Sequence, residues 1–238
     1  MKVDILAIGV HPDDVELSCC GTLLQHIANG KTVGLLDLTQ GELGTRGSAP
    51  LRFKEAAASA QIMGAVFREN LGMADGFFKN TTENKLKIVE VIRRCQPEIV
   101  LANALRDRHP DHGRAATMTA EACFLAGLVK VETHHDGQLQ ERWRPKAVYH
   151  YIQDHNLEPD FVVDISDSID KKMDCILAFA SQFYDPNSKE LDSPISGKGF
   201  LEFIRSKNQV MGRAAGFDYA EGFNVSRTIG LSNLFDLS

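Results

Sequence analysis

The sequence predicts one α/β domain over residues 1–238, with a Rossmann-like, doubly wound and mostly parallel sheet in a three-layer arrangement. Short apolar runs rich in β-branched residues alternate with helical patterns over the first 130 residues. No shift in composition marks a domain boundary, and no repeat of solenoid length occurs. A chain of 238 residues can bury a large apolar core without disulfide or metal support.

Each element of this fold is predicted from its own pattern. Apolar, β-branched runs predict strands at Val3–Val10, Thr32–Thr39, Val66–Leu71, Glu98–Asn103, Ala147–Gln153 and Phe161–Ile165. Helical periodicity and stop signals such as Asn29-Gly30 predict helices at Asp13–Asn29, Arg52–Gly64, Asn84–Arg94, Asp111–Leu125, Ser168–Phe183 and Gly199–Gly216. The loop at residues 40–50 carries three glycines and one proline, and we expect it to be functional.

Composition and charge exclude several classes of partner. The net charge is −6, so the chain offers no overall basic field for nucleic acid or an anionic membrane. The longest stretch of low charge, residues 115–129, is shorter than the roughly 20 apolar residues that span a bilayer. The five cysteines are odd in number and lack a C-x-x-C pair. We therefore expect a cytoplasmic protein whose cysteines serve packing.

Two related motifs follow two of the predicted strands. His11-Pro12-Asp13-Asp14 comes directly after the first strand, and His109-Pro110-Asp111-His112 follows the strand at residues 98–103 by a short loop. Ligand sites of open parallel sheets form outside the carboxyl ends of the strands, so the two motifs are expected to converge. Each proline keeps the preceding histidine out of the helical region and therefore in the turn.

The spacing within these motifs predicts a metal site. The first and fourth residues of such a turn lie on the same side, so His11 and Asp14 can bind one ion. His112 is the simplest third ligand, and two imidazoles, one carboxylate and solvent match catalytic zinc sites. Asp13 would stand beside the solvent molecule as general base.

Two residues of the second motif are assigned supporting roles. His109 is expected to stabilise an oxyanion or to protonate a leaving amine. Asp111 is expected to orient a ring nitrogen of a histidine ligand.

The two motifs carry a resemblance to a known family. His11-Pro12-Asp13-Asp14-x-Glu16 together with His109-Pro110-Asp111-His112 resembles the LmbE-like, PIG-L type family of zinc-dependent de-N-acetylases over nearly the whole chain. The resemblance implies that His11, Asp14 and His112 bind zinc, that Asp13 is the base, and that His109 assists the tetrahedral intermediate. It also implies a homo-oligomer, such as a trimer or hexamer.

A narrower resemblance concerns the substrate. Gly41-Glu42-Leu43-Gly44-Thr45-Arg46-Gly47, the following Arg52, and Tyr219-Ala220-Glu221-Gly222-Phe223 resemble family members that deacetylate N-acetylglucosaminyl malate in bacillithiol biosynthesis. The segment Ser18-Cys19-Cys20-Gly21 departs from the glycine-richer sequence of relatives, which puts close helix packing there in doubt.

Candidate substrate-binding residues follow from the chemistry of such a substrate. Arginine suits bidentate capture of carboxylates, and the candidates are Arg46, Arg52 and Arg108. Glu42 and Asp75 are candidates for binding sugar hydroxyls. Tyr184 is a candidate for gating the site or donating to an oxyanion.

The expected activity is zinc-dependent hydrolysis of the N-acetyl group of an N-acetylglucosaminyl conjugate, with Fe²⁺ as the alternative metal. N-Acetylglucosaminyl L-malate is the specific substrate expected. Other N-acetylglucosamine substrates and a metal-dependent phosphoesterase remain as alternatives. Dinucleotide-binding, P-loop and serine-hydrolase activities are excluded, since G-x-G-x-x-G after the first strand, G-x-x-x-x-G-K-[ST] and G-x-S-x-G are all missing.

Overall fold

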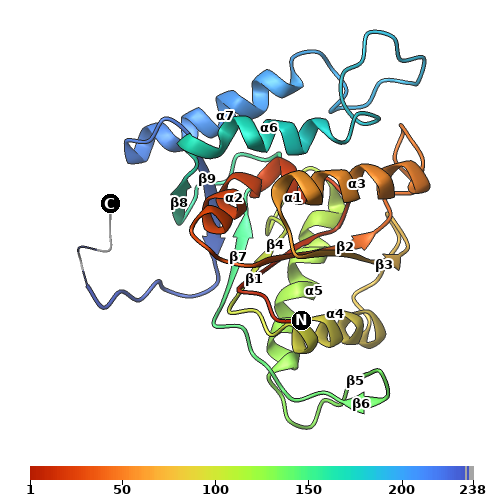
Figure 1. Cartoon of the computed structure of the whole chain (residues 1–238), viewed down its shortest axis with the longest axis vertical. Coiled ribbons are helices and arrows are strands. Elements are labelled where there is room, and N and C mark those ends of the chain that lie inside the picture. Colours follow the sequence, from red (N-terminus) through yellow and green to blue (C-terminus); the bar gives the residue numbers. More distant parts are fainter. Residues whose placement is uncertain (234, 236–238) are drawn as a thin grey trace.

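The computed structural model describes residues 1–233 and residue 235 (Figure 1). One sheet of seven strands runs through this part of the chain, in the order β3-β2-β1-β4-β7-β9-β8. Its strands are β1 (Ile5–Gly9), β2 (Val33–Thr39), β3 (Phe67–Met73), β4 (Ile99–Ala102), β7 (Ala147–Tyr151), β8 (Phe161–Asp164) and β9 (Ala220–Val225). A separate small hairpin consists of β5 (His134–His135) and β6 (Gln138–Leu139).

The order of the strands fixes where a ligand site can form. β1 pairs in parallel with both β2 and β4, and β3 and β7 extend the parallel sheet on either side. The chain therefore builds outward from β1 to β3 and then returns to the other side of β1. β9 runs antiparallel between β7 and β8. The prediction of a mostly parallel sheet is confirmed, and the arrangement is consistent with a Rossmann-like fold that reverses between β1 and β4.

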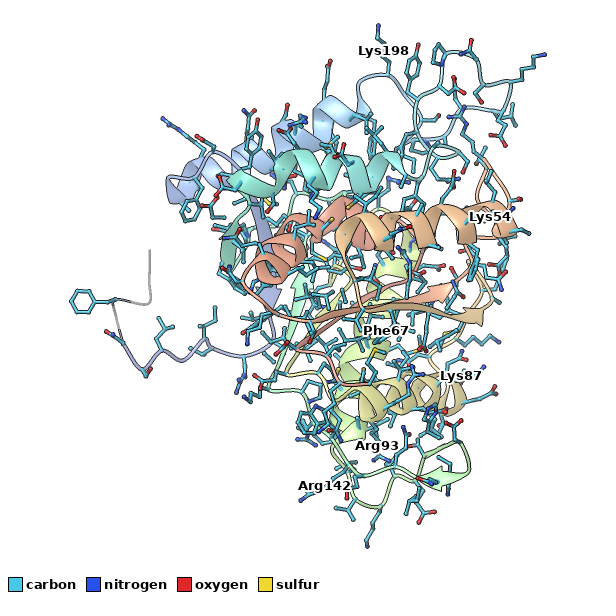
Figure 2. All side chains as sticks on the ribbon, viewed as in Figure 1. Lys54, Phe67, Lys87, Arg93, Arg142 and Lys198 are labelled. Carbon is cyan, nitrogen blue, oxygen red and sulfur yellow. The ribbon has the colours of Figure 1, made fainter. Side chains whose placement is uncertain are left out.

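Helices lie on both faces of the sheet (Figure 1). α4 and α5 are on one face, and α1, α2 and α3 are on the other, with α6 and α7 further out on that second side. Their bounds are α1 (Asp14–Ser18), α2 (Cys20–Ala28), α3 (Ala49–Met63), α4 (Thr82–Cys95), α5 (Pro110–Ala126), α6 (Ile169–Leu177) and α7 (Phe200–Ala215), with a short 3₁₀ helix at Ser166–Ser168. Charged side chains such as Lys87 and Lys198 extend away from the ribbon (Figure 2).

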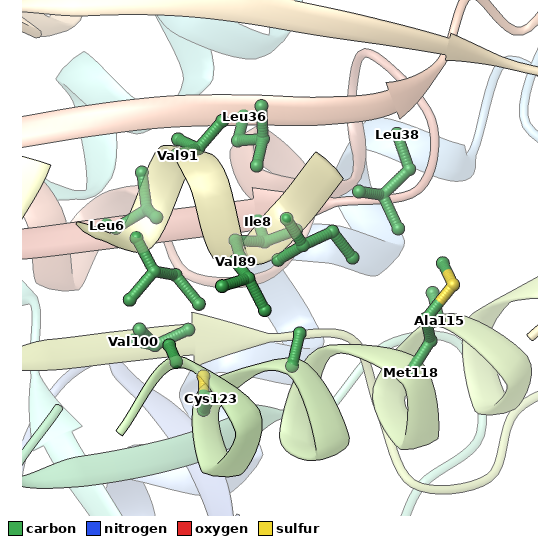
Figure 3. Close-up of a cluster of buried hydrophobic side chains, with 14 of the residues drawn as sticks. Leu6, Ile8, Leu36, Leu38, Val89, Val91, Val100, Ala115, Met118 and Cys123 are labelled. Atoms are coloured by element: carbon green, nitrogen blue, oxygen red, sulfur yellow. The ribbon is translucent and has the colours of Figure 1, made fainter. Parts of the chain in front are cut away.

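The core consists of apolar layers on each side of the sheet. Alternate residues of a strand point to opposite faces, so Leu6 and Ile8 of β1 contribute to one layer and Ile5 and Ala7 to the other. Figure 3 shows the first layer, in which side chains of β1, β2 and β4 pack against α4 and α5. Because β1 is buried along its whole length, the turn that follows it starts from a fixed position.

The predicted helix at residues 13–29 is divided into α1 and α2. Cys19 separates them, with a backbone φ of −142° that belongs to no helix. Cys19 and Cys20 are fully buried, as the packing interpretation expects. A Cβ atom on the neighbouring Gly21 would lie 2.8 Å from the side chain of Ile165. Close packing at this point therefore depends on Gly21 and tolerates a side chain at position 20.

A buried carboxylate explains why a second helix begins at this point. Glu221 of β9 accepts hydrogen bonds from the backbone N–H groups of Gly21 and Thr22, at 3.0 and 2.7 Å. Lys172 of α6 donates to the same carboxylate at 2.7 Å, and both charged side chains are fully buried. Glu221 thus satisfies free N–H groups in the first turn of α2 from 200 residues away. A local sequence pattern does not contain this contact.

The C-terminal part differs most from prediction. The helix predicted at residues 168–183 ends at Leu177. Beyond that end, the Glu55 side chain accepts hydrogen bonds from the backbone N–H and hydroxyl of Ser181. β9 was not predicted as a strand, although its residues were noted as a motif. The hairpin of β5 and β6 was not predicted either.

All five cysteines are buried free thiols. Burial raises the pKa of Cys95 and of Cys123 to about 12, so these thiols are unreactive packing groups. None of the helices in the described part of the chain has the length and apolar character required to cross a bilayer.

The first prediction concerns the buried pair of Lys172 and Glu221. The substitution Glu221→Gln leaves the Lys172 ammonium buried without a counter-charge, so we expect the free energy of unfolding to fall by about 3 kcal/mol or more. Urea unfolding measures this change. The matched control is Glu98→Gln, which removes an exposed pair with Lys146 and should cost at most about 1 kcal/mol. Equal effects of the two substitutions would contradict the importance of the buried pair.

Candidate active site

The two His-Pro-Asp turns meet at the reversal point of the sheet. The first follows β1 and the second begins α5 after β4, the neighbouring parallel strand. The ring centroids of His11 and His112 are 5.5 Å apart, and His109 lies 4.7 Å from His11 and 5.2 Å from His112. One nitrogen from each of the three rings lies within 4.8 Å of the other two. Residues separated by nearly one hundred positions therefore form a single cluster.

The carboxylate of Asp14 lies inside this cluster and is held on several sides. Its Oδ2 atom accepts hydrogen bonds from the backbone N–H groups of Val10 and His11 and from the Asn103 side chain, each at 2.9 Å. Its Oδ1 atom accepts a bond of 3.1 Å from the amide of Gln153. Because Asp14 is buried and bonded to both β1 and the end of β4, its position is fixed by the sheet.

Each of the two predicted histidine ligands has one nitrogen occupied by an outer carboxylate. His11 Nε2 lies 3.0 Å from Asp75 Oδ1, and His112 Nδ1 lies 2.5 Å from Asp107 Oδ2. The other nitrogens turn inward, with His11 Nδ1 3.7 Å from Asp14 Oδ2 and His112 Nε2 3.2 Å from Asp14 Oδ1. Outer carboxylates that fix the ring in this way accompany most histidine ligands of metal ions. The set of two imidazole nitrogens and one carboxylate fits a divalent transition metal.

A second group of ligand atoms also includes His11. Its ring nitrogen and the carboxylates of Asp75 and Asp111 lie within 4.8 Å of one another. In this group Asp111 Oδ2 is 3.7 Å from His11 Nε2, and it accepts a hydrogen bond from the backbone of Gly76 at 2.8 Å. Asp111 also binds Arg114 at 2.7 Å. These partners favour an orienting role for both carboxylates, since their oxygens already satisfy neighbouring donors.

The electrostatics of the cluster favour a cation. Burial acts to lower the pKa of His112, but Asp14 and Asp107 outweigh it and raise the pKa to about 9. Burial acts to raise the pKa of Asp14, but His112 and His11 hold it well below its usual value. Burial also acts to raise the pKa of Asp107, but the hydrogen bond with His112 outweighs it and lowers that pKa to about 2. The carboxylates of Asp14 and Asp107 therefore stay ionised, and a metal ion held in this cluster would replace the proton that they stabilise on His112.

Asp13 stands beside the cluster in a different environment. Burial raises the pKa of its carboxyl group, and the nearby Arg52 guanidinium opposes that rise. Arg52 donates to Asp13 Oδ2 at 2.8 Å and to the backbone oxygen of Gly41 at 3.2 Å. Any side chain at Gly41 would collide with Arg52, because a Cβ atom there would lie 2.0 Å from its Nη1 atom. The glycine-rich loop thus lets Arg52 reach Asp13.

His109 is the third imidazole of the cluster. Burial, followed by the nearby His11 and His112, lowers the pKa of its ring, so it is neutral near pH 7. Its Nδ1 atom accepts a hydrogen bond from the backbone N–H of Asp111 at 3.3 Å. The neutral ring therefore carries its proton on Nε2.

A cavity of about 490 Å³ opens over these groups. His11, Asp13, Asp14, His109 and His112 line one part of it. The remaining wall is largely apolar and comes from α1, the loops after β2 and β3, the connection between α6 and α7, and α7 itself, through Leu17, Leu43, Phe77, Pro194, Ile195, Phe200, Phe203 and Ile204. A mostly apolar cavity with a few convergent polar groups is typical of small-molecule sites.

The predicted substrate residues divide into two groups. Arg52 and Arg108 line the cavity, and Arg108 donates to Asp154, another lining residue, at 2.6 Å. Arg46, Glu42 and Tyr184 lie outside the lining. Arg46 donates to the backbone oxygen of Phe183, Glu42 accepts from the backbone of Asp75, and Tyr184 is half exposed. The structure thus gives Arg46 and Glu42 contacts that hold the glycine-rich loop.

Sequence reasoning missed the residues that hold the cluster from outside. Asn103 donates both to Asp14 and to Gln153 Oε1, and Gln153 in turn lies 3.4 Å from His112 Nε2. Asp107 was not singled out, and Asp75 was considered only for sugar binding. Asn103 and Gln153 are the last residues of two predicted strands, so the carboxyl-end rule that located the two motifs could also have located them.

Comparison with known proteins shows similarity over most of the chain. Diacetylchitobiose deacetylase of Thermococcus kodakarensis is 30% identical over 228 residues, which are 92% of this chain and 81% of that protein. The solved structure of the conserved protein TT1542 from Thermus thermophilus is 36% identical, with a TM-score of 0.86 and 98% of each chain covered.

Two further relatives differ in activity from the first. A probable N-acetyl-α-D-glucosaminyl L-malate deacetylase of Bacillus anthracis is 24% identical, with 75% of this chain and 81% of that protein covered. The narrower resemblance to such enzymes is therefore distant. The 4-oxalmesaconate hydratase of Pseudomonas putida is 28% identical, with coverage of 74% and 73%.

The family assignment rests on sequence as well as on the site. The profile described as GlcNAc-PI de-N-acetylase matches residues 6–123, a region that contains both His-Pro-Asp motifs. Together with the extended similarity to diacetylchitobiose deacetylase, this match shows that the chain belongs to the PIG-L family.

Proposed function

We propose that this chain hydrolyses the N-acetyl group of an N-acetylglucosamine conjugate in a metal-dependent reaction, releasing acetate and a free amino sugar. One observation carries the proposal. A buried carboxylate with a raised pKa, Asp13, lines the same cavity as a cluster suited to a divalent metal ion. Hydrolysis of an unactivated amide requires both a base for water and stabilisation of the developing oxyanion.

The metal would be held by His11 Nδ1, the Asp14 carboxylate and His112 Nε2, with Zn²⁺ as the proposed ion. A bound divalent ion supplies a Lewis acid for the amide carbonyl and lowers the pKa of its water. Fe²⁺ is the alternative, because two histidines and one carboxylate are also the ligands of non-haem iron sites.

The side chains around the cluster have separate tasks. Asp13 accepts the proton of the attacking water, and Arg52 keeps its carboxylate ionised and fixed in orientation. The neutral ring of His109 donates from Nε2 to the oxygen on which negative charge develops. The proton held by Asp13 then passes to the departing amine. Asp75 and Asp107 keep the two ligand rings in place.

The substrate class follows from the family and the cavity. N-Acetylglucosaminyl L-malate is the specific candidate from the motifs, and N,N′-diacetylchitobiose is the candidate from the relative in Thermococcus. The cavity is large enough for more than the acetamido group, and its apolar walls suit the non-polar face of a sugar ring or an apolar substituent.

The direct test is acetate release from a set of amides. Wild type should release acetate from N-acetylglucosaminyl malate or diacetylchitobiose, and a chelator should abolish the release. Asp13→Asn should lower kcat by about 100-fold or more while the bound metal is kept. A phosphate ester and an unsaturated dicarboxylic acid serve as controls for phosphoesterase and hydratase activity. Turnover of a control in place of every amide would refute the proposal.

A second prediction concerns the outer carboxylate of His112. Asp107→Asn removes the charge that fixes the ring, so we expect Zn²⁺ affinity to fall about 10- to 100-fold. Calorimetric titration of the metal-free protein measures it. Asp154→Asn is the matched control, because Asp154 lines the same cavity but binds Arg108. If both variants kept wild-type affinity, Asp107 would have no part in holding the metal.

A third prediction concerns pH. Arg52 opposes the rise in the pKa of Asp13, so Arg52→Gln should raise that pKa further. The base is active only when deprotonated, and the acid limb of kcat/KM should therefore move to higher pH. Arg108→Gln, which leaves Asp13 untouched, should not move the limb. A limb that stayed in place, or moved to lower pH, in the Arg52 variant would argue against Asp13 as the base.

A further inference from the structure

The cavity contains three cationic side chains with different partners. Arg52 binds Asp13 at 2.8 Å, and Arg108 binds Asp154 at 2.6 Å. Lys207 of α7 is the third. No ion pair found in the described part of the chain includes Lys207. The cavity therefore contains one positive charge that no carboxylate of residues 1–233 neutralises by direct contact.

Lys207 is anchored close to the reactive cluster. Its ammonium group donates to the backbone oxygens of Ile152, at 3.2 Å, and of Gln153. The side chain of Gln153 binds Asp14, so this anchor lies one residue from the metal cluster. An ammonium group has three N–H donors, and these contacts use two of them. The third remains for a group that enters the cavity.

The surroundings of Lys207 are unlike those of a surface lysine. Burial lowers the pKa of its ammonium group to about 8, and the nearby Lys172 adds to this effect. The carboxylates of Asp107, Asp154 and Glu221 act in the opposite direction, but none of them forms an ion pair with Lys207. Apolar side chains of the same helix, Phe203 and Ile204, share the cavity wall with it. A charge in such a place is costly unless it is paired, and it attracts an anion more strongly than it would in water. By contrast, Lys198 extends into solvent (Figure 2).

We propose that Lys207 is a specificity-determining residue that binds an anionic group, a carboxylate or a phosphate, on the part of the substrate attached to the amino sugar. This inference rests on the proposed deacetylase function. The substrate would supply a directly bound counter-charge, which none of the described carboxylates provides, while its amide lies at the cluster next to Gln153. Acidic conjugates would then be preferred over neutral glycosides of the same sugar.

The test compares three substrates that share one amide. They are the neutral methyl N-acetylglucosaminide, N-acetylglucosaminyl malate with two carboxylates, and N-acetylglucosamine 1-phosphate. Lys207→Met should lower kcat/KM for the preferred acidic substrate by about 10- to 100-fold, the usual scale for a charge-assisted hydrogen bond, and change the neutral substrate by less than about 2-fold. Lys207→Arg should keep most of the preference. The matched control is Lys198→Met, which removes the same charge outside the cavity lining.

The outcomes separate this inference from the function on which it rests. Selective loss with the malate or the phosphate supports the inference and identifies which anion is recognised. Equal loss with acidic and neutral substrates means that Lys207 only holds the backbone at residues 152–153, and this overturns the inference while the deacetylase function stands. Wild-type preference for the neutral glycoside overturns it as well. Lys207→Gln, which keeps a donor for the backbone oxygens, replaces the Met variant if that variant unfolds. Wild type that releases no acetate from any substrate refutes the proposed function itself.

Discussion

The carboxylate of Asp14 is the contact on which the rest of the site depends. It accepts hydrogen bonds from the backbone after β1, from Asn103 at the end of β4 and from Gln153 beyond β7. These donors come from three adjacent parallel strands, so the carboxylate sits where the winding of the sheet reverses. The open groove at such a reversal is the place where doubly wound sheets bind ligands. The two imidazoles face this carboxylate because outer carboxylates occupy their other nitrogens. The Asp14 carboxylate thus both links the ends of the strands and faces the two imidazoles of the site.

Much of the fold follows from local pattern. The strands from β1 to β4 and the helices α3, α4 and α5 were predicted because their apolar residues recur with clear spacing and their ends carry proline or glycine. Apart from the local hairpin of β5 and β6, the departures involve contacts between residues that are distant in sequence. Glu221 accepts hydrogen bonds from the first N–H groups of α2, and Glu55 binds Ser181 in the segment that follows α6. β9 pairs antiparallel between two strands that lie far from it in sequence. The local spacing of apolar residues does not predict any of these long-range contacts.

Sequence reasoning could predict the part of the site that belongs to the two short motifs. His11, Asp13, Asp14, His109 and His112 stand at fixed spacing in two turns, and the topology brings them together. Asp107 stands in a loop outside both motifs, and only the folded chain reveals its contact with His112, whereas Gln153 ends a predicted strand and could have been found by the carboxyl-end rule. Lys207 could not be identified from the sequence, since nothing in a helical pattern distinguishes it from an exposed lysine. Arginine residues were predicted as substrate contacts from their chemistry alone, but Arg46 uses its guanidinium group to hold a loop.

The central claim is that the two turns bind one metal ion between His11, Asp14 and His112. Anomalous diffraction at the zinc edge, from crystals grown with Zn²⁺, tests it most directly. We expect a single strong peak enclosed by His11 Nδ1, the Asp14 carboxylate and His112 Nε2. A peak between His11, Asp75 and Asp111, or crystals with zinc at the surface and none in the cluster, would contradict it.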